Sequence, residues 1–218
     1  MAQFEVSKTN QVRQLREKAD YDEAAVHQIL DAGLVAQVGF IEDGAPLVVP
    51  MMYGRDGNRL FLHGARKARV IRMLEATPKV CVNVTLLDGI VYARSLFNSS
   101  MNYRSVTVHG AARLIEGEAK LYALNVISDH AMPGRREEVR DSHENEVLMT
   151  GVIELIIEHA AAKISAGPPD DEEADYASEV WAGVMPLRLK PGALIRDPKL
   201  PESILPTPRM QHQTGRVF

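Results

Sequence analysis

The sequence has little cysteine and no excess of positive charge. Its 218 residues include one cysteine, Cys81, and carry a formal net charge of −4. One cysteine cannot form an internal disulfide framework and is compatible with a reducing cytoplasm. Because a general nucleic-acid-binding protein normally carries a basic excess, the charge argues against nucleic acid as a partner.

The chain also lacks long hydrophobic runs and several common catalytic motifs. No apolar run is long enough to span a bilayer, and the first residues lack the apolar core of a signal peptide. We therefore expect a cytoplasmic protein with no membrane partner. The sequence contains no phosphate-loop or Rossmann glycine motif, no His-Glu-x-x-His pair and no Gly-x-Ser-x-Gly elbow. The seven histidines are scattered rather than paired at ligand spacing, so no metal site is expected.

The most informative feature that is present is a group of cations where a helix begins. The apolar residues after position 69 have helical spacing, which predicts a helix that starts near Ala65. Its first turns contain no acidic residue and four basic ones, Arg66, Lys67, Arg69 and Arg72. Exposed cations oppose the helix dipole at a cost of about 0.3–1 kcal/mol each, whereas free N–H groups and basic side chains together attract anions. We predict a phosphate-binding site here; the alternative is a solvated basic face.

A second group of polar side chains enters a strand near residue 102. Its members offer amide, hydroxyl and guanidinium groups to a ligand with several acceptors, and they are Asn102, Tyr103, Arg104 and Ser105. Strand alternation places Arg104 and Ser105 on opposite faces, so both serve one pocket only if the strand contains a bulge. The alternative is a hairpin end whose polar side chains are solvated.

The segment 49–53 is unusual for a strand because it contains a proline. Pro50 removes one donor from the strand ladder, which leaves backbone groups beside Met51 and Met52 free to bond the ring heteroatoms of a ligand. The alternative is that the two methionines fill a core. The only tryptophan, Trp181, either packs in the core or lines a flat aromatic ligand.

The hydrophobic pattern predicts closely spaced antiparallel strands with a few helices, which is typical of a small α+β barrel. Helices are expected over 20–33 and 118–131, and strands over 34–41, 46–53, 59–63, 79–86, 90–96, 103–115, 152–157 and 180–189. Turn signals at 42–44 and 87–89 predict hairpins. Four prolines after Asp197 predict an extended tail.

Taken in order, several motifs resemble those of the pyridoxamine 5′-phosphate oxidase-related proteins with an FMN-binding split barrel. The nearer resemblance is to the flavin-nucleotide-binding or nitroimidazole-resistance-like branch. The segments that carry it are 19–22, 34–40, 49–53, 62–64, 88–95, 100–106, 163–170 and 181–186. The resemblance implies one six-stranded antiparallel split-barrel domain with flanking helices over 1–196, followed by a proline-rich extended tail over 197–218.

The resemblance also implies a homodimer with two FMN sites at the subunit interface. It places the FMN phosphate near the basic residues at 66, 67 and 69, and His63 close to the cofactor. It places the isoalloxazine ring along the strand segment 50–52. The residues that would complete the pocket are Asn102, Tyr103, Arg104, Ser105 and, from the partner subunit, Trp181.

We therefore expect an FMN-dependent oxidoreductase that passes electrons from a nicotinamide or other donor to a small organic acceptor. The chain lacks a match to the Trp-x-x-x-Arg-Leu element of true pyridoxamine phosphate oxidases, so vitamin B6 oxidation is not expected. Two alternatives remain. One is a flavin-binding protein without enzymatic activity, and the other is a haem-binding split-barrel protein with His109 or His159 as an axial ligand.

Overall fold

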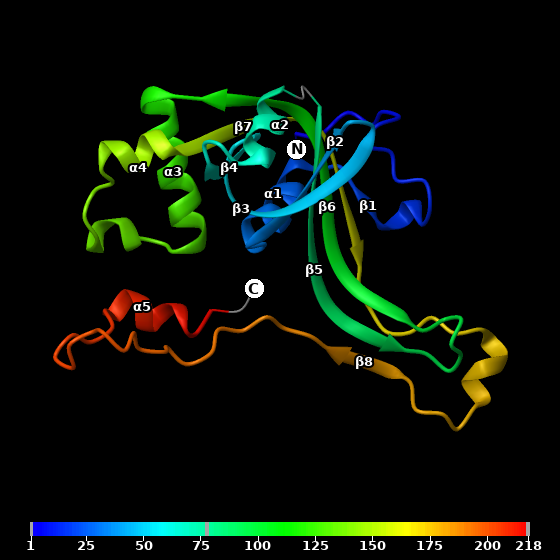
Figure 1. The fold of residues 1–218 in the computed structure, drawn as a ribbon. Helices are drawn as coiled ribbons and strands as arrows, with labels where there is room; N and C mark the ends of the chain where they lie inside the picture. Colours follow the sequence, from blue (N-terminus) through cyan, green and yellow to red (C-terminus); the bar gives the residue numbers. More distant parts are fainter. Residues whose placement is uncertain (1, 77–78, 217–218) are drawn as a thin grey trace. The chain divides into compact units, whose positions relative to one another are not determined.

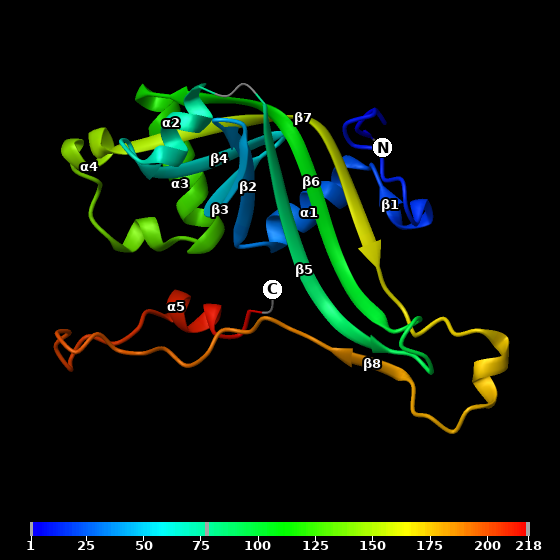
Figure 2. The ribbon, with the colours of Figure 1, turned by 45° about the vertical axis from the view of Figure 1, so that its right-hand side comes forward.

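Strand pairing closes a barrel in the computed structural model, which describes residues 2–76 and 79–216 (Figures 1 and 2). The strands are β1 (Ala19–Asp20), β2 (Val35–Glu42), β3 (Ala45–Asp56), β4 (Arg59–Ala65), β5 (Val80–Tyr92), β6 (Ser100–Ile115), β7 (Thr150–Ser165) and β8 (Gly183–Pro186). The α-helices are α1 (Glu23–Ala32), α2 (Arg69–Ala76), α3 (Gly117–Ala131), α4 (Glu144–Met149) and α5 (Pro208–Gln213). Short 3₁₀ turns lie at Arg16–Lys18, Arg135–Glu138 and Glu173–Ala177.

The chain forms two compact units. The first comprises Met1–Leu86 and Tyr103–Ser165, and the second comprises Leu87–Asn102 and Ala166–Phe218. In the first unit the strands are neighbours in the order β7, β4, β3, β2, β5 and β6, and β6 pairs with β7 to close the ring. The predicted six-stranded α+β barrel is confirmed. The predicted division at residue 196 falls inside the second unit and stays a prediction.

Alternate residues of the barrel strands fill its interior, as a side-chain period of two requires. On β2, Ala36, Val38 and Phe40 are buried, whereas Gln37 and Ile41 between and beyond them are exposed. The helix α1 closes one side of the same core with its buried apolar side chains. The residues between the buried ones point away from the barrel interior, and we call the side of the strands that they form the outer face.

The first hairpin and the first helix form where the sequence predicts them. Asp43 and Gly44, between β2 and β3, both have positive φ angles, 49° and 80°, as a tight two-residue hairpin turn requires. The side chain of Asp22 accepts a hydrogen bond from the backbone N–H of Ala24 at 3.2 Å and caps α1. The helix ends one residue before Gly33.

The second predicted hairpin, at 87–89, is wrong. β5 runs without interruption from Val80 to Tyr92, and Gly89 is a strand residue opposite Pro186. A Cβ atom on Gly89 would lie 2.9 Å from Cγ1 of Val184 and 3.1 Å from the carbonyl oxygen of Met185. The glycine therefore allows β8 to approach closely and does not make a turn.

Two other boundaries differ from the prediction. The helix expected from Ala65 begins at Arg69, because β4 continues to Ala65 and the backbone N–H of Arg66 donates to the Met149 carbonyl at 2.7 Å. The tail, which was expected to be extended, contains the helix α5. The Thr207 hydroxyl caps this helix by accepting a hydrogen bond from the Met210 backbone N–H at 3.2 Å, and Pro208 lies in its first turn.

The helix α3 packs on the outer face of β3 and β4 (Figures 1 and 2). A Cβ atom on Gly54 of β3 would lie 2.8 Å from the backbone of Ile127, so only glycine permits this contact. The second hydrophobic cluster forms beneath the helix from Phe61, Ile115, Ala123, Ile127 and Val152. Among the described residues, no helix is long and apolar enough to cross a membrane.

Candidate functional site

The outer face of β3 and β4 brings together three of the predicted site residues. Pro50, Met52 and His63 lie on the side of the strands that also carries Phe61 and α3. Pro50 is exposed, and Met52 is half-buried against the cluster beneath α3. Met51 points into the barrel and is buried in its core, which agrees with the alternative that this methionine fills a core. The segment 50–52 therefore presents two side chains, not three, to a ligand outside the barrel.

His63 has an unusual environment within this group. Its ring lies on β4 opposite Val152 of β7, and its Nδ1 atom is buried without a hydrogen-bond partner among the described residues. Burial disfavours the charged imidazolium and lowers the pKa of His63. A buried nitrogen without a hydrogen-bond partner destabilises the folded state. A bound ligand with a matching polar atom would remove this cost. His63 is therefore the strongest candidate for a ligand contact on this face.

The basic turn before α2 follows β4 directly. Arg66 forms a bidentate pair with Glu75, with nitrogen–oxygen distances of 3.1 and 3.3 Å, and Arg69 pairs with Glu42. Lys67 and Arg72 are exposed, and the side chain of neither makes a hydrogen bond or ion pair with any other described residue. Two of the four cations are thus balanced by carboxylates, and two remain available to an external anion.

The polar segment at the start of β6 separates into two faces. Ser105 lies on the outer face and donates to the Lys163 carbonyl at 3.4 Å, and Tyr103 shares that face. Arg104 lies on the same side as the buried Val106. β6 and β7 pair without a shift between Tyr103 and His109, so no bulge turns Arg104 and Ser105 to one pocket.

The remaining two predicted residues belong to the second unit. The side-chain amide of Asn102 donates to the Gly167 carbonyl at 2.9 Å. Trp181 is 69% exposed, and its ring centre lies 6.1 Å from that of Tyr92. Both residues therefore present polar or aromatic surface on the second unit.

The structure also contains a cavity that the sequence did not indicate. It has a volume of about 370 Å³ and lies on the outer face between the β2–β3 hairpin and β5, β6 and β7. Its walls include Ile41, Pro46, Val48, Cys81, His109 and His159. The hairpin side chains that point to the outer face are apolar, namely Ile41, Pro46 and Val48. Apolar residues at alternate, outward positions are the sequence signal that could have indicated this cavity.

Residues 22–164 match the family described as Pyridoxamine 5′-phosphate oxidase. No curated protein sequence is significantly similar to the chain.

Solved structures give closer matches. The chain is similar to the flavocytochrome Anf3 from Azotobacter vinelandii, with 37% identity, a TM-score of 0.89, and coverage of 95% of this chain and 97% of that one. It is similar to the FAD and haem binding protein from Mycobacterium smegmatis, with 35% identity, a TM-score of 0.87, and coverage of 90% and 97%. A 5-nitroimidazole antibiotic resistance protein from Bacteroides thetaiotaomicron shares the fold at 24% identity, with a TM-score of 0.56 and coverage of 67% and 86%.

Proposed function

The chain belongs to the pyridoxamine 5′-phosphate oxidase family, and on this premise we propose that it is a redox protein that binds a flavin nucleotide and haem. The observation that carries the proposal is its similarity, over nearly the whole of each chain, to a flavocytochrome and to an FAD and haem binding protein. A bound flavin supplies electron and hydride transfer, and haem supplies one-electron transfer. The sequence motifs favour FMN, and one relative is named for FAD; both contain the same ring system and a phosphate.

The outer face of β3 and β4 carries side chains that match the ring of a flavin. The unpartnered Nδ1 of His63 offers a hydrogen bond to a ring heteroatom, and burial keeps the imidazole neutral. Met52 offers a polarisable apolar surface beside it. These two side chains would orient the ring and exclude water from one edge of it.

The basic turn fits the flavin phosphate. Lys67 and Arg72 have no partner among the described residues and would pair with the phosphate directly. Arg66 and Arg69 would contribute by exchanging Glu75 and Glu42 for the phosphate. The first turn of α2, which contains no acidic residue, adds its free N–H groups and the positive end of the helix dipole.

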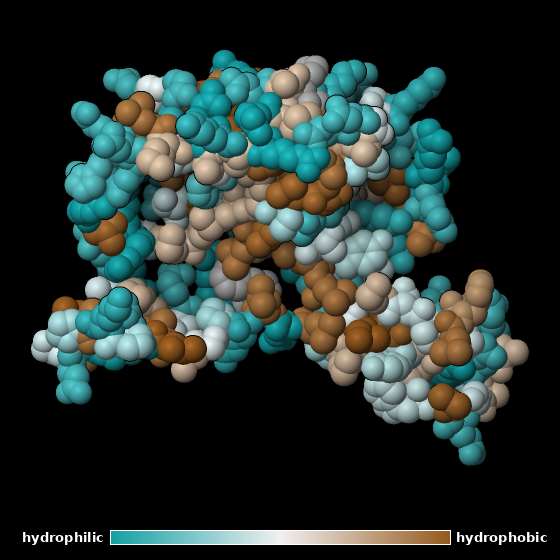
Figure 3. Space-filling model, viewed as in Figure 1, coloured by the Kyte–Doolittle hydropathy of each residue, from teal (hydrophilic) through white to brown (hydrophobic). Residues whose placement is uncertain are grey.

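We propose a homodimer, because the second unit exposes large apolar side chains that a second copy would cover. Leu96 is 96% exposed, Phe97 is 93% exposed and Trp181 is 69% exposed. Figure 3 shows brown, hydrophobic side chains at the surface of this unit. Exposed apolar patches of this kind mark protein interfaces. In the proposed dimer Trp181 approaches the flavin pocket of the partner subunit.

The visible spectrum of the purified full-length protein tests the cofactors. We expect flavin absorption, release of a flavin nucleotide on denaturation, and a Soret band after haem is supplied. Lys67→Ala should weaken flavin binding by about tenfold, the loss of one charge-assisted contact. Lys8→Ala, which removes an exposed lysine from the N-terminal segment of the same unit, is the matched control and should not change the affinity.

Two results would contradict the flavin assignment. One is a colourless protein that binds neither added FMN nor added FAD, and the other is an equal flavin affinity in the Lys67 and Lys8 variants. Bleaching of the bound flavin by a nicotinamide donor under anaerobic conditions, followed by reoxidation with a small organic acceptor, would support an oxidoreductase. Bound flavin that no donor reduces would favour the flavin-binding protein without enzymatic activity.

A further inference from the structure

The cavity on the outer face is separate from the residues proposed to hold the flavin. The apolar part of its wall comes from the β2–β3 hairpin, where Ile41 is 55% exposed and Val48 is 65% exposed, with Pro46 between them. A soluble strand normally carries polar side chains on a face that no other element of the chain covers. An apolar wall beside a cavity of about 370 Å³ therefore indicates a flat or bulky apolar ligand.

Two histidines face each other on the opposite wall. His109 on β6 and His159 on β7 are register partners, so their rings leave the sheet on the same side. The strand register shifts directly after this pair, between His109 and Gly110. A Cβ atom on Gly110 would lie 1.8 Å from the Ile156 carbonyl oxygen, so only glycine fits there. The bulge thus fixes the two imidazoles at the cavity, as bulges commonly do beside functional sites.

The two rings differ in their surroundings. The Nδ1 atom of His159 lies 3.5 Å from the Ser7 hydroxyl, whereas the His109 ring makes no hydrogen bond with any described residue. An imidazole nitrogen that no other side chain occupies is available to bind iron.

The charged residues at the cavity complete the chemical description of the ligand. Lys79 and Glu158 both line it and both are exposed. Lys79 can pair with a carboxylate of the ligand, and the opposite charge of Glu158 makes this site a poor match for a doubly charged phosphate. Haem combines an apolar plane, a metal that binds imidazole and carboxylate groups. The apolar wall, His109 and Lys79 match these three features in turn.

We propose that this cavity is the haem-binding site of the chain, with His109 as the axial ligand and Lys79 beside a propionate. The assignment rests on the proposed function, which includes haem, and adds the location and the ligating residue. The apolar side chains of the β2–β3 hairpin would lie against the porphyrin, and His159 lines the cavity beside His109 without binding iron.

Haem titration of the full-length protein tests this assignment by Soret absorption and by electron paramagnetic resonance of the ferric form. The wild-type chain should bind one haem with an imidazole-ligated spectrum. His109→Ala should weaken haem binding by about tenfold or more and lose the imidazole signature, and added imidazole should restore it. His212→Ala, at an exposed histidine outside the cavity, is the matched control and should keep the wild-type spectrum. His159→Ala should keep the imidazole signature, and His63→Ala tests the β3–β4 face as the alternative location.

The possible failures are distinguishable. If the wild-type chain binds no haem, the haem part of the proposed function fails together with the site. If the wild-type chain binds haem and His109→Ala has the same spectrum and affinity, the site is wrong and the proposed function stands; loss of the signature in the His63 variant would move the haem to the β3–β4 face. Should His109→Ala fail to fold, Val48→Glu places a charge on the exposed apolar wall. Unchanged haem affinity in that variant would overturn the assignment.

Discussion

The two units of the chain use their apolar residues in different ways. The first unit closes a ring of strands and buries two hydrophobic clusters, one inside the barrel and one beneath α3. In the second unit, Gly89, Val91 and Asp171 are the only buried residues among those described, although it carries many large apolar side chains. Burial of apolar surface contributes about 25 cal/mol per Å². The first unit therefore has its own source of stability, whereas the second leaves most of its large apolar side chains exposed.

Polar contacts hold segments of the second unit together, whereas apolar packing does so in the first unit. The Arg94 guanidinium lies 3.0 Å from a carboxylate oxygen of Asp171, and the backbone N–H of Arg94 donates to the other oxygen at 2.7 Å. The same guanidinium lies 4.8 Å from the ring centre of Tyr176. The side chain of Asp171 is fully buried in this contact. A single buried carboxylate thus fastens the segment after β5 to the segment before the 3₁₀ turn at Glu173–Ala177.

Substitution at the bulge of the barrel should have the largest effect. Gly110→Ala would place a methyl group within 2 Å of the Ile156 carbonyl, a contact that neither backbone can relieve without breaking the β6–β7 pairing. We expect a loss of about 3 kcal/mol or more in the free energy of unfolding, measured by urea denaturation.

A glycine of the second unit provides the control for this change. Gly192→Ala adds a methyl group where no atom lies within 4 Å, and its effect should stay within about 0.5 kcal/mol. Equal stability of the two alanine variants would mean that the bulge is not held as tightly as the barrel geometry implies.

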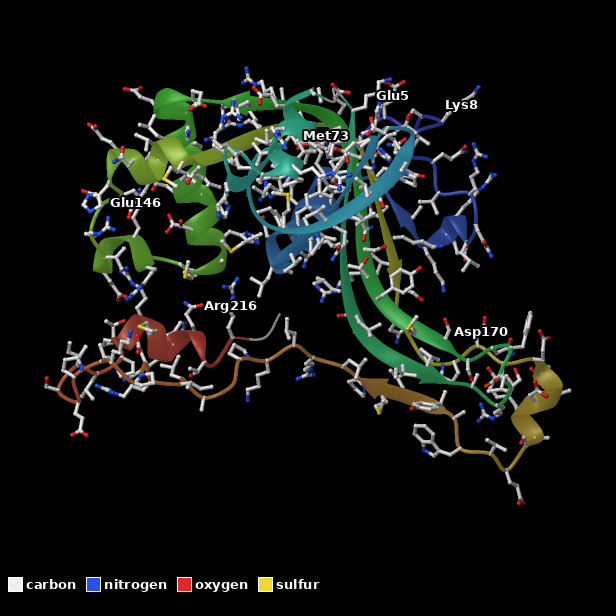
Figure 4. All side chains as sticks on the ribbon, viewed as in Figure 1. Glu5, Lys8, Met73, Glu146, Asp170 and Arg216 are labelled. Carbon is white, nitrogen blue, oxygen red and sulfur yellow. The ribbon has the colours of Figure 1, made fainter. Side chains whose placement is uncertain are left out.

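Loss of the buried carboxylate should have the next largest effect, confined to the second unit. Asp171→Asn leaves Arg94 without its ionic partner. We expect a local loss of about 2–3 kcal/mol, below the value of about 3–5 kcal/mol for a fully buried pair, because Arg94 is partly exposed. Limited proteolysis should cut the second unit faster while urea denaturation of the barrel is unchanged. The neighbouring Asp170, labelled in Figure 4, is exposed, and Asp170→Asn should leave the cleavage rate as in the wild type.

The apolar surface of the second unit should affect association rather than folding. Phe97→Ser removes a side chain that is 93% exposed, so the monomer should keep its stability while the dissociation constant of the dimer rises by about tenfold. Sedimentation velocity over a concentration series measures this change. Leu148→Ser, at a residue of α4 in the first unit that is 68% exposed, is the control. A dimer that both substitutions leave intact would remove Phe97 from the proposed interface.

The features that local sequence determines were predicted best. The capped helix before Gly33 and the hairpin at Asp43–Gly44 follow from caps and turn residues, and alternation predicts a small α+β barrel. The number of six strands came from the family resemblance. The hairpin at 87–89 was mistaken because Asp-Gly is the usual turn signal, and only the approach of β8 shows that Gly89 has another role. The sequence does not contain that information, since β8 lies about a hundred residues further along the chain.

The candidate site shows the same division between local and distant causes. Alternation predicted that Arg104 and Ser105 face opposite ways, and the strand register agrees. The carboxylates that pair with Arg66 and Arg69 come from α2 and from the end of β2, so tertiary contacts, not local charge, decide which cations stay free. The cavity was missed because its walls come from five strands and the N-terminal segment, which no local pattern connects.

The smallest effect we predict is a pH dependence of the stability of the first unit that originates at His63. Burial lowers its pKa below the ordinary 6.5, so the unfolded chain binds the proton first as the pH falls. The stability contribution is therefore complete above pH 6.5 and is lost as the pH falls through the lower native pKa. The slope should stay well below the limit of about 1.4 kcal/mol per pH unit for one proton, because the ring is partly exposed.

Urea denaturation between pH 7.5 and about pH 5 measures this effect. His63→Gln, which retains a polar side chain but does not titrate, should reduce the slope, and His109→Gln should reduce it by a further increment because burial lowers that pKa too. Bound flavin should shift the wild-type loss of stability to lower pH if His63 bonds the ring, since protonation would then compete with the ligand. A slope that the His63 substitution leaves unchanged, with and without flavin, would mean that the unpartnered nitrogen on β4 has no energetic role in either the fold or the site.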